Sequence, residues 1–140
     1  MQFPVKAHYA TLAMLALASR YDTKELQSAR NIASEHGIPN QFLGQILQQL
    51  RTAGLIHSTR GANGGFSLQR PPQQISVYEI IEAVCPFSIG GTETEEKSVF
   101  GPVVQQVWED LRGSQQRFLA NLTLSELLEN AEKNSPMFYI

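Results

Sequence analysis

Hydrophobic positions in the first half of the chain recur at the period of an α-helix in three successive segments. The first, over residues 5–19, is apolar nearly all round, so we expect both of its faces to be covered. Ser28 is placed to cap a second, shorter helix, and Gly37 to end it in a left-handed conformation. The third is expected over residues 39–53, and together with the second it forms a helix-turn-helix. Its buried side should carry four aliphatic side chains, with Phe42 beside them: Leu43, Ile46, Leu47 and Leu50.

Two short strand-like segments follow Gly54, where the third helix should stop. Residues 55–60 and 66–69 flank a glycine-rich turn, and this combination is typical of a β-hairpin. A hairpin directly after a helix-turn-helix is the arrangement of a winged helix. The sequence therefore predicts a mainly α fold with a small β-hairpin wing.

Two capping boxes mark the starts of further helices. Ser76 pairs with Glu79 in the first, and Thr123 pairs with Glu126 in the second, which opens a helix running to about residue 133. Between them, a long helix is expected to start near residue 102 and could reach residue 122. Its apolar positions approximate a heptad seam, with Trp108 and Leu122 beside it: Val104, Val107, Leu111 and Phe118.

Charge is divided unevenly along the 140 residues. The first half carries a net charge of +4 and the second half −6, although the whole chain has only −2. Residues 36–78 contain no Asp or Glu, yet they contain Arg51, Arg60 and Arg70. A surface without carboxylates but with arginines suits contact with a polyanion, and nucleic acid is the natural candidate.

Amide side chains line one stripe of the predicted 39–53 helix. Gln41, Gln45 and Gln48 lie there with Gly44, opposite the aliphatic side, and Gln can donate to and accept from adenine in the major groove. A solvated amide face is the alternative for this stripe. Arg60 lies at the root of the hairpin turn, where a narrow loop could carry it into a minor groove. An ordinary turn is the alternative for the loop.

Seven short segments occur in a fixed order along residues 1–84. They are Lys6-Ala7-His8-Tyr9-Ala10, Ile32-Ala33, Gly37-Ile38-Pro39, Phe42-Leu43, Leu50-Arg51-Thr52-Ala53-Gly54-Leu55, Arg60-Gly61-Ala62-Asn63-Gly64-Gly65-Phe66 and Arg70-Pro71-Pro72. In this order they resemble the Rrf-two family of bacterial winged-helix regulators. That family includes the iron–sulfur cluster regulator, the nitric-oxide-sensing repressor and the cysteine-metabolism repressor.

The resemblance implies a cytoplasmic homodimer that binds a partly palindromic promoter site on double-stranded DNA. It divides the chain into a winged helix-turn-helix domain (1–84), a loop (85–101) and a dimerisation helix followed by a C-terminal helix (102–140). Nothing approaches the ~20 apolar residues of a membrane span. The resemblance and the amide stripe together give these expected DNA-binding residues: Lys6, Tyr9, Gln41, Gln45, Gln48, Arg51 and Arg60.

The chain departs from the better-known members at its cysteines. Many members carry three cysteines in the loop before the long helix, whereas this chain has only Cys85, at the end of the preceding helix. One thiolate cannot hold an iron–sulfur cluster, so we expect no cofactor and no metal site. Cys85 itself could be a half-buried structural thiol, a redox sensor or a residue without a role. His8 and Gly44 also replace residues more usual in the family.

The sequence thus predicts a cluster-less, homodimeric transcription regulator, most simply a repressor, with an effector that the sequence does not identify. A winged helix that docks on a protein, through the acidic stretch 93–96, is one alternative. A thiol-based redox regulator acting through Cys85 is another. No catalytic constellation is recognisable, so an enzyme is not expected.

Overall fold

The computed structural model describes residues 3–86 and 97–134. The expected loop with the acidic stretch 93–96 therefore lies largely outside the described residues. The elements follow in this order: α1 (Val5–Ala18), α2 (Ala29–His36), α3 (Asn40–Thr52), β1 (Ile56–Thr59), β2 (Gly65–Leu68), the 3-10 turn η1 (Pro72–Gln74), α4 (Val77–Val84), α5 (Gly101–Ala120) and α6 (Leu124–Lys133). The mainly α fold with a two-stranded wing is confirmed.

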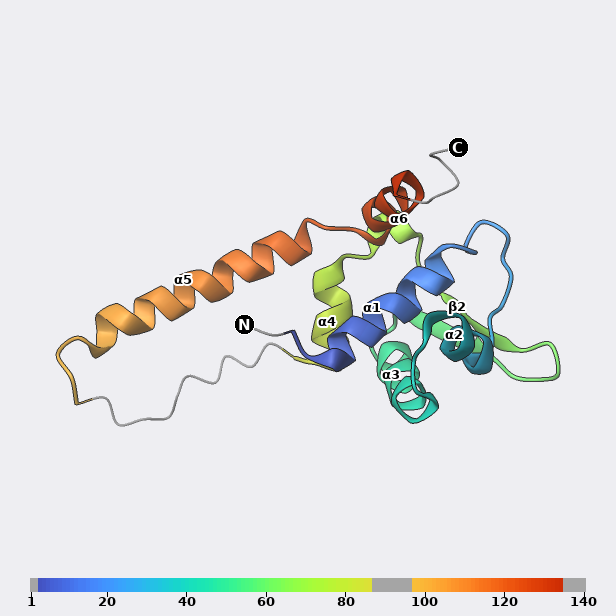
Figure 1. The fold of residues 1–140 in the computed structure, drawn as a ribbon, viewed down its shortest axis with the longest axis horizontal. Coiled ribbons are helices and arrows are strands. Elements are labelled where there is room, and N and C mark those ends of the chain that lie inside the picture. The colour runs from blue at the N-terminus through green and yellow to red at the C-terminus, as the bar shows by residue number, and fades with distance from the viewer. Residues whose placement is uncertain (1–2, 87–96, 135–140) are drawn as a thin grey trace.

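Helix α1 lies at the centre of the body, and α2, α3, α4, α6 and β2 all pack against it (Figure 1). Small side chains make this possible, because Ala7, Ala10, Ala13 and Ala16 are all buried along the helix. Alanine lets neighbouring backbones approach closely while still favouring the helix. The prediction that α1 is covered on both faces is confirmed for most of its length.

Most of the local signals for the helix ends behave as predicted. The backbone N–H of Asn31 donates to Ser28 Oγ (3.1 Å) and starts α2, and Gly37 ends it with φ +66°. Helix α3 ends at Thr52 with Ala53 as its C-cap, and Gly54 follows with φ +79°. Pro39 lies at the N-cap of α3, one position earlier than expected.

Helix α4 opens with the predicted capping box. The Glu79 N–H donates to Ser76 Oγ (3.2 Å), and the Ser76 N–H donates to Glu79 Oε2 (3.0 Å). The second box is only half formed. The Glu126 N–H donates to Thr123 Oγ1 (3.2 Å), but the Glu126 carboxylate does not accept the reciprocal bond from the Thr123 N–H.

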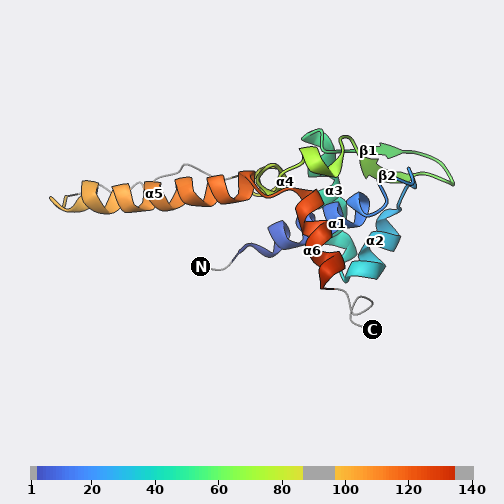
Figure 2. The same cartoon turned by 90° about the horizontal axis from the view of Figure 1, so that it is seen from above.

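Helix α5 extends away from the body and α6 returns to it (Figures 1 and 2). Leu124 at the start of α6 is fully buried in the main core, and α6 packs along α1. The long helix ends at Ala120, so Leu122 does not lie beside the apolar seam as expected. It packs instead against the cluster formed by Ala7, Val77, Ile81 and Leu119, because the chain turns back toward the body there. The predicted division at residues 85 and 102 stays a prediction.

Arg70 joins the end of the wing to the start of α4. Its Nη2 donates to Glu79 Oε1 at 2.8 Å, so the capping carboxylate also forms an ion pair. Burial raises the pKa of Glu79, but the Ser76 N–H and the Arg70 guanidinium together outweigh it and hold the pKa below its ordinary value. The folded state therefore favours the charged carboxylate.

Replacing Glu79 by Gln should lower the free energy of unfolding at neutral pH by roughly 0.5–1 kcal/mol, since the ion pair is partly exposed. A lowered native pKa stabilises the fold above the unfolded-state pKa and loses that contribution as the pH falls through the native value. The difference between wild type and variant should therefore shrink below about pH 4. Urea unfolding at pH 7 and in acid measures it, with Glu129→Gln on α6 as control. A difference in unfolding free energy between wild type and variant that widens in acid would contradict the lowered pKa of Glu79.

Candidate nucleic-acid interface

The stripe of α3 that faces away from the body is polar and carries no carboxylate. Gln41, Gln45, Gln48 and Arg51 are all exposed along it, at intervals of three or four residues. The opposite side holds the four predicted aliphatic side chains, all buried. The core therefore fixes the rotation of α3, and the amides and the guanidinium point outward.

Gly44 lies in the middle of this stripe and has no conformational or steric reason to be glycine. It is exposed, it is helical, and a Cβ built on it would meet nothing within 4 Å. Within a helix, glycine costs about 0.8–1 kcal/mol relative to alanine. The chain thus accepts a local destabilisation that no contact within the molecule explains.

The wing is an antiparallel hairpin in the register Ile56 with Leu68 and Thr59 with Gly65. Arg60 follows β1 directly and is exposed. Gly64 and Gly65 are required by packing: a Cβ on Gly64 would overlap the Thr59 carbonyl oxygen. The wing projects from the body beyond its two strands (Figure 2), with Arg60 at the base of the projecting turn.

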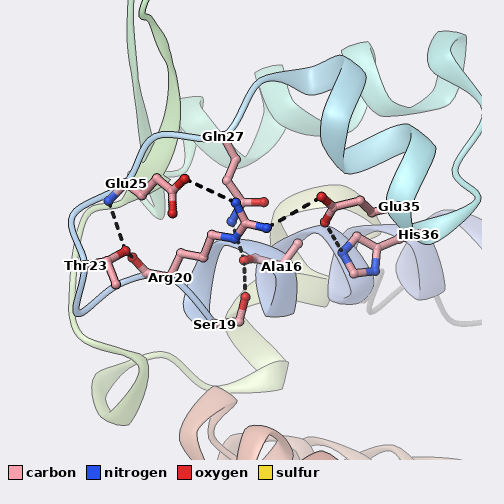
Figure 3. Close-up of polar contacts among 8 residues, drawn as sticks. All are labelled: Ala16, Ser19, Arg20, Thr23, Glu25, Gln27, Glu35 and His36. Atoms are coloured by element: carbon pink, nitrogen blue, oxygen red, sulfur yellow. Dashed lines mark hydrogen bonds and ion pairs between the residues drawn. The ribbon is translucent and has the colours of Figure 1, made fainter.

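Gln27 anchors the wing, a role that sequence patterns do not indicate. Its backbone pairs with Phe66 on the outer edge of β2 through two hydrogen bonds of 3.1 and 2.8 Å. Its side chain is 2% exposed, and its Nε2 donates to the Ala16 carbonyl oxygen of α1 (Figure 3). A Cβ on Gly65 would lie 2.8 Å from the Gln27 carbonyl oxygen. The wing is thereby joined to the central helix.

A shallow hollow of about 230 Å³ lies between α3 and the wing. Gly44 and Gln48 line it from α3, while Ser58 and Phe66 line it from the hairpin. Arg51 spans its edge, since its Nη1 lies 3.5 Å from Ser58 Oγ. The structure thus brings the stripe of α3 and the hairpin together on one surface.

The remaining predicted residues lie on and around α1. Tyr9 is half-buried, with its ring 5.9 Å from that of Phe42, which is itself exposed at the start of α3. Lys6 is half-buried one turn earlier on α1. The ring contact places Tyr9 near the N-terminal end of α3. The contacts of Lys6 and Tyr9 with DNA stay a prediction, as do those of the α3 and wing residues.

The Rrf2 family, described as an iron-dependent transcriptional regulator, matches residues 4–130. The chain belongs to this family. The resemblance to the Rrf-two regulators is therefore confirmed, and with it the winged helix-turn-helix architecture of a DNA-binding transcription regulator.

Solved and curated relatives agree with this placement. The Rrf2 chain is 34% identical over 136 residues to the HTH-type transcriptional regulator IscR of Klebsiella pneumoniae, covering 94% of this chain and 82% of that one. Its fold matches IscR of T. potens with a TM-score of 0.78 and 31% identity, covering 100% and 97% of the two chains. It also matches CymR, the global cysteine regulator of B. subtilis, with a TM-score of 0.78 and 28% identity, over 93% and 98%.

Residues 3–86 and 97–134 of this Rrf2 protein supply one thiol toward an iron–sulfur cluster. Cys85 is the single cysteine of the chain and is half-buried at the end of α4. It packs against two clusters of buried apolar side chains, the main core around α1 and a smaller cluster that includes Val77 and Leu119. Between residues 3 and 86 and between 97 and 134, no three His, Cys, Asp or Glu side chains gather as a metal site would require. A cluster needs several thiolates or substitutes.

No helix in the described ranges is both long and apolar enough to cross a membrane. Relatives of the Rrf2 protein are transcriptional regulators rather than enzymes.

Alanine at two glycines should have opposite effects on stability. Gly44→Ala should raise the free energy of unfolding by about 1 kcal/mol, because its Cβ enters open space on a helix. Gly65→Ala should lower it, because the Cβ would push Gln27 away from the wing. Thermal and urea unfolding of both variants measure this. A destabilised Gly44→Ala variant would show a contact that the single chain does not contain.

Proposed function

We propose that this Rrf2 protein is a cytoplasmic, sequence-specific, homodimeric DNA-binding repressor that works without an iron–sulfur cluster. The observation that carries the DNA-binding part is the surface shared by α3 and the wing. It combines an exposed amide stripe, an exposed arginine beside the hairpin turn and a complete lack of carboxylates over residues 36–78.

In this proposal α3 enters the major groove and the wing turn follows the adjacent minor groove. Gln41, Gln45 and Gln48 read base edges, since Gln can bind adenine through two hydrogen bonds. Arg60 responds to the width and potential of the minor groove. Lys6, Tyr9 and Arg51 contact the phosphate backbone. Such contacts fix the orientation of the protein on the duplex.

Gly44 supports close approach of α3 to the DNA. Its missing side chain costs helix stability without relieving any contact inside the protein. A nucleic-acid edge pressed against that stripe would supply the missing reason. The stabilised Gly44→Ala variant should accordingly bind its operator less tightly than wild type.

The partner of α5 in the proposed dimer is a second copy of α5. In the single chain, Val107, Trp108 and Phe118 are 54%, 52% and 69% exposed, and Val104 and Leu111 are exposed beside them. Aliphatic and aromatic side chains in such a row are costly to leave in water. The seam has the spacing of a two-helix interface, so a two-fold related copy would cover it.

The absence of a cluster is supported by the thiol count. Cys85 is the one possible thiolate ligand, and the apolar clusters on both sides of it explain a half-buried structural thiol. The family is described as iron-dependent. In this protein, a dependence on iron would have an origin other than a bound cluster, or it would be absent. The repressor assignment follows from the resemblance to the family.

Selection from a random duplex library tests the proposed function. The purified protein should enrich a partly palindromic sequence with half-sites about one helical turn (~34–36 Å) apart. Binding to it should weaken steeply as salt rises, because phosphate contacts release counterions. Retention without enrichment, or binding insensitive to salt, would favour docking on a protein partner instead.

Arg60→Ala should weaken operator binding by about 1–3 kcal/mol, most strongly on sites with a narrow minor groove. Titration at fixed salt against A-tract and mixed-sequence flanks measures the effect. Lys133→Ala, which removes an exposed charge from the end of α6, is the matched control and should bind like wild type. Equal affinities for the Arg60 variant and the control would show that the wing stays outside the minor groove.

Leu111→Glu should convert the dimer to a monomer, since it places a charge in the centre of the apolar seam of α5. Analytical ultracentrifugation at several concentrations measures the association. Gln106→Glu adds the same charge on α5 away from the seam and should remain dimeric. A wild-type protein that sediments as a monomer would remove the basis for a palindromic operator.

A further inference from the structure

A second hollow, of about 440 Å³, lies on the side of the hairpin opposite α3. The segment between α1 and α2 forms one wall, and the hairpin forms the other through His57 and Ser67, whose side-chain Nε2 and Oγ lie 2.9 Å apart. Strand side chains alternate between faces, and Ser58 and Phe66 line the α3 side instead. The hairpin therefore separates two recesses, and only one faces the proposed DNA site.

The floor of this recess is apolar. Leu17 and Leu68 are buried beneath it, and Leu26 and Tyr21 are half-buried at its sides. Its volume falls within the ~300–1,000 Å³ range of small-molecule sites, which combine an apolar lining with a few polar groups. An apolar group of a small molecule would fit this floor.

The rim of the recess carries both acidic and basic side chains, and only some of them already form ion pairs. Arg20 contacts Glu25 and Glu35, each at 3.5 Å, so its charge is matched within the protein (Figure 3). Asp22 and Lys24 also line the recess, yet neither side chain forms an ion pair with another described residue. Asp22 and Lys24 therefore supply one carboxylate and one ammonium that lie outside the ion pairs of the described residues.

The backbone at this rim is strained. Lys24 has φ +57°, and it is the one residue other than glycine with a positive φ within the described ranges. Its N–H donates to the Tyr21 carbonyl oxygen (3.2 Å), which closes a tight turn. Residues held in such conformations gather at ligand and switch sites.

We propose that this recess binds a small zwitterion with an apolar side chain, of the kind represented by an apolar amino acid. The ligand's carboxylate pairs with Lys24, its ammonium group pairs with Asp22, and its side chain covers the floor formed by Leu17, Leu26 and Leu68. A ligand with a single charge would leave one rim charge unmatched.

The recess is coupled to the wing by direct contacts. Its loop wall leads into Gln27, which pairs with Phe66 and packs against Gly65. Its other wall is the back of the same hairpin, through His57 and Ser67. An occupant between these walls changes the free energy of any wing displacement, so ligand and DNA would alter each other's affinity by the same factor. This coupling rests on the proposed function, whereas the ligand site does not.

Three probes with the same ring test the ligand chemistry: L-phenylalanine, 3-phenylpropionate and phenethylamine, with L-leucine as a second apolar zwitterion. Titration of the full-length protein without DNA, followed by amide chemical shifts, should show saturable binding of the zwitterions, with shifts at Tyr21, His57 and Ser67. The two single-charge probes should bind about tenfold more weakly, the effect of one lost charged contact.

Lys24→Gln and Asp22→Asn should each weaken phenylalanine binding by about tenfold. Lys97→Gln, an exposed lysine outside the recess, should leave it unchanged. No saturable binding of either zwitterion, equal binding of all three ring probes, or shifts confined to other surfaces would overturn the ligand site.

The coupling has a separate test. Saturating zwitterion should change the affinity for the selected operator by at least about fivefold. Zwitterion binding with unchanged operator affinity would overturn the coupling but leave the site. A protein that binds zwitterion but enriches no operator would instead count against the proposed function.

Discussion

The close packing of small side chains along α1 is the constraint on which the remaining structure depends. Helices α2, α3, α4 and α6 and strand β2 all pack against this helix, and its buried alanines set how near α3, α4 and α6 can come. A larger side chain at Ala10 or Ala13 would have to displace one of these neighbours, because cores do not absorb added volume without strain. The outward rotation of α3 is thus set from within α1.

The wing depends on the same helix through one polar residue. Gln27 is the polar residue buried in the core of the described part of the chain. It lies in the segment between α1 and α2, and it connects that segment to α1 and to β2. A two-stranded hairpin alone is marginal in water, and this third strand-like pairing gives it an anchored edge. The Gln27 side-chain nitrogen donates to a main-chain carbonyl oxygen, so this buried atom has a hydrogen-bond partner.

Signals that act within a few residues were readable from the sequence, and contacts between distant segments were not. Ser28, Gly37 and the Ser76–Glu79 box could be predicted because a cap bonds its own helix. The apolar period fixed which face of α3 is exposed, and with it the candidate stripe. Gln27 was missed since its partners lie on α1 and β2, and Leu122 was misplaced because the chain turns back after α5. The recess behind the hairpin likewise exists only when two distant walls meet.

The projection of α5 from the body has a geometric consequence in the proposed dimer. A helix of 20 residues is about 30 Å long, and the body is attached at one end of it. The place and angle at which two such helices cross would then determine the separation of the two winged domains. The spacing between half-sites and the preference for particular bases would thus be encoded in different helices. Relatives could diverge in operator length by changing α5 while α3 continues to recognise the same half-site.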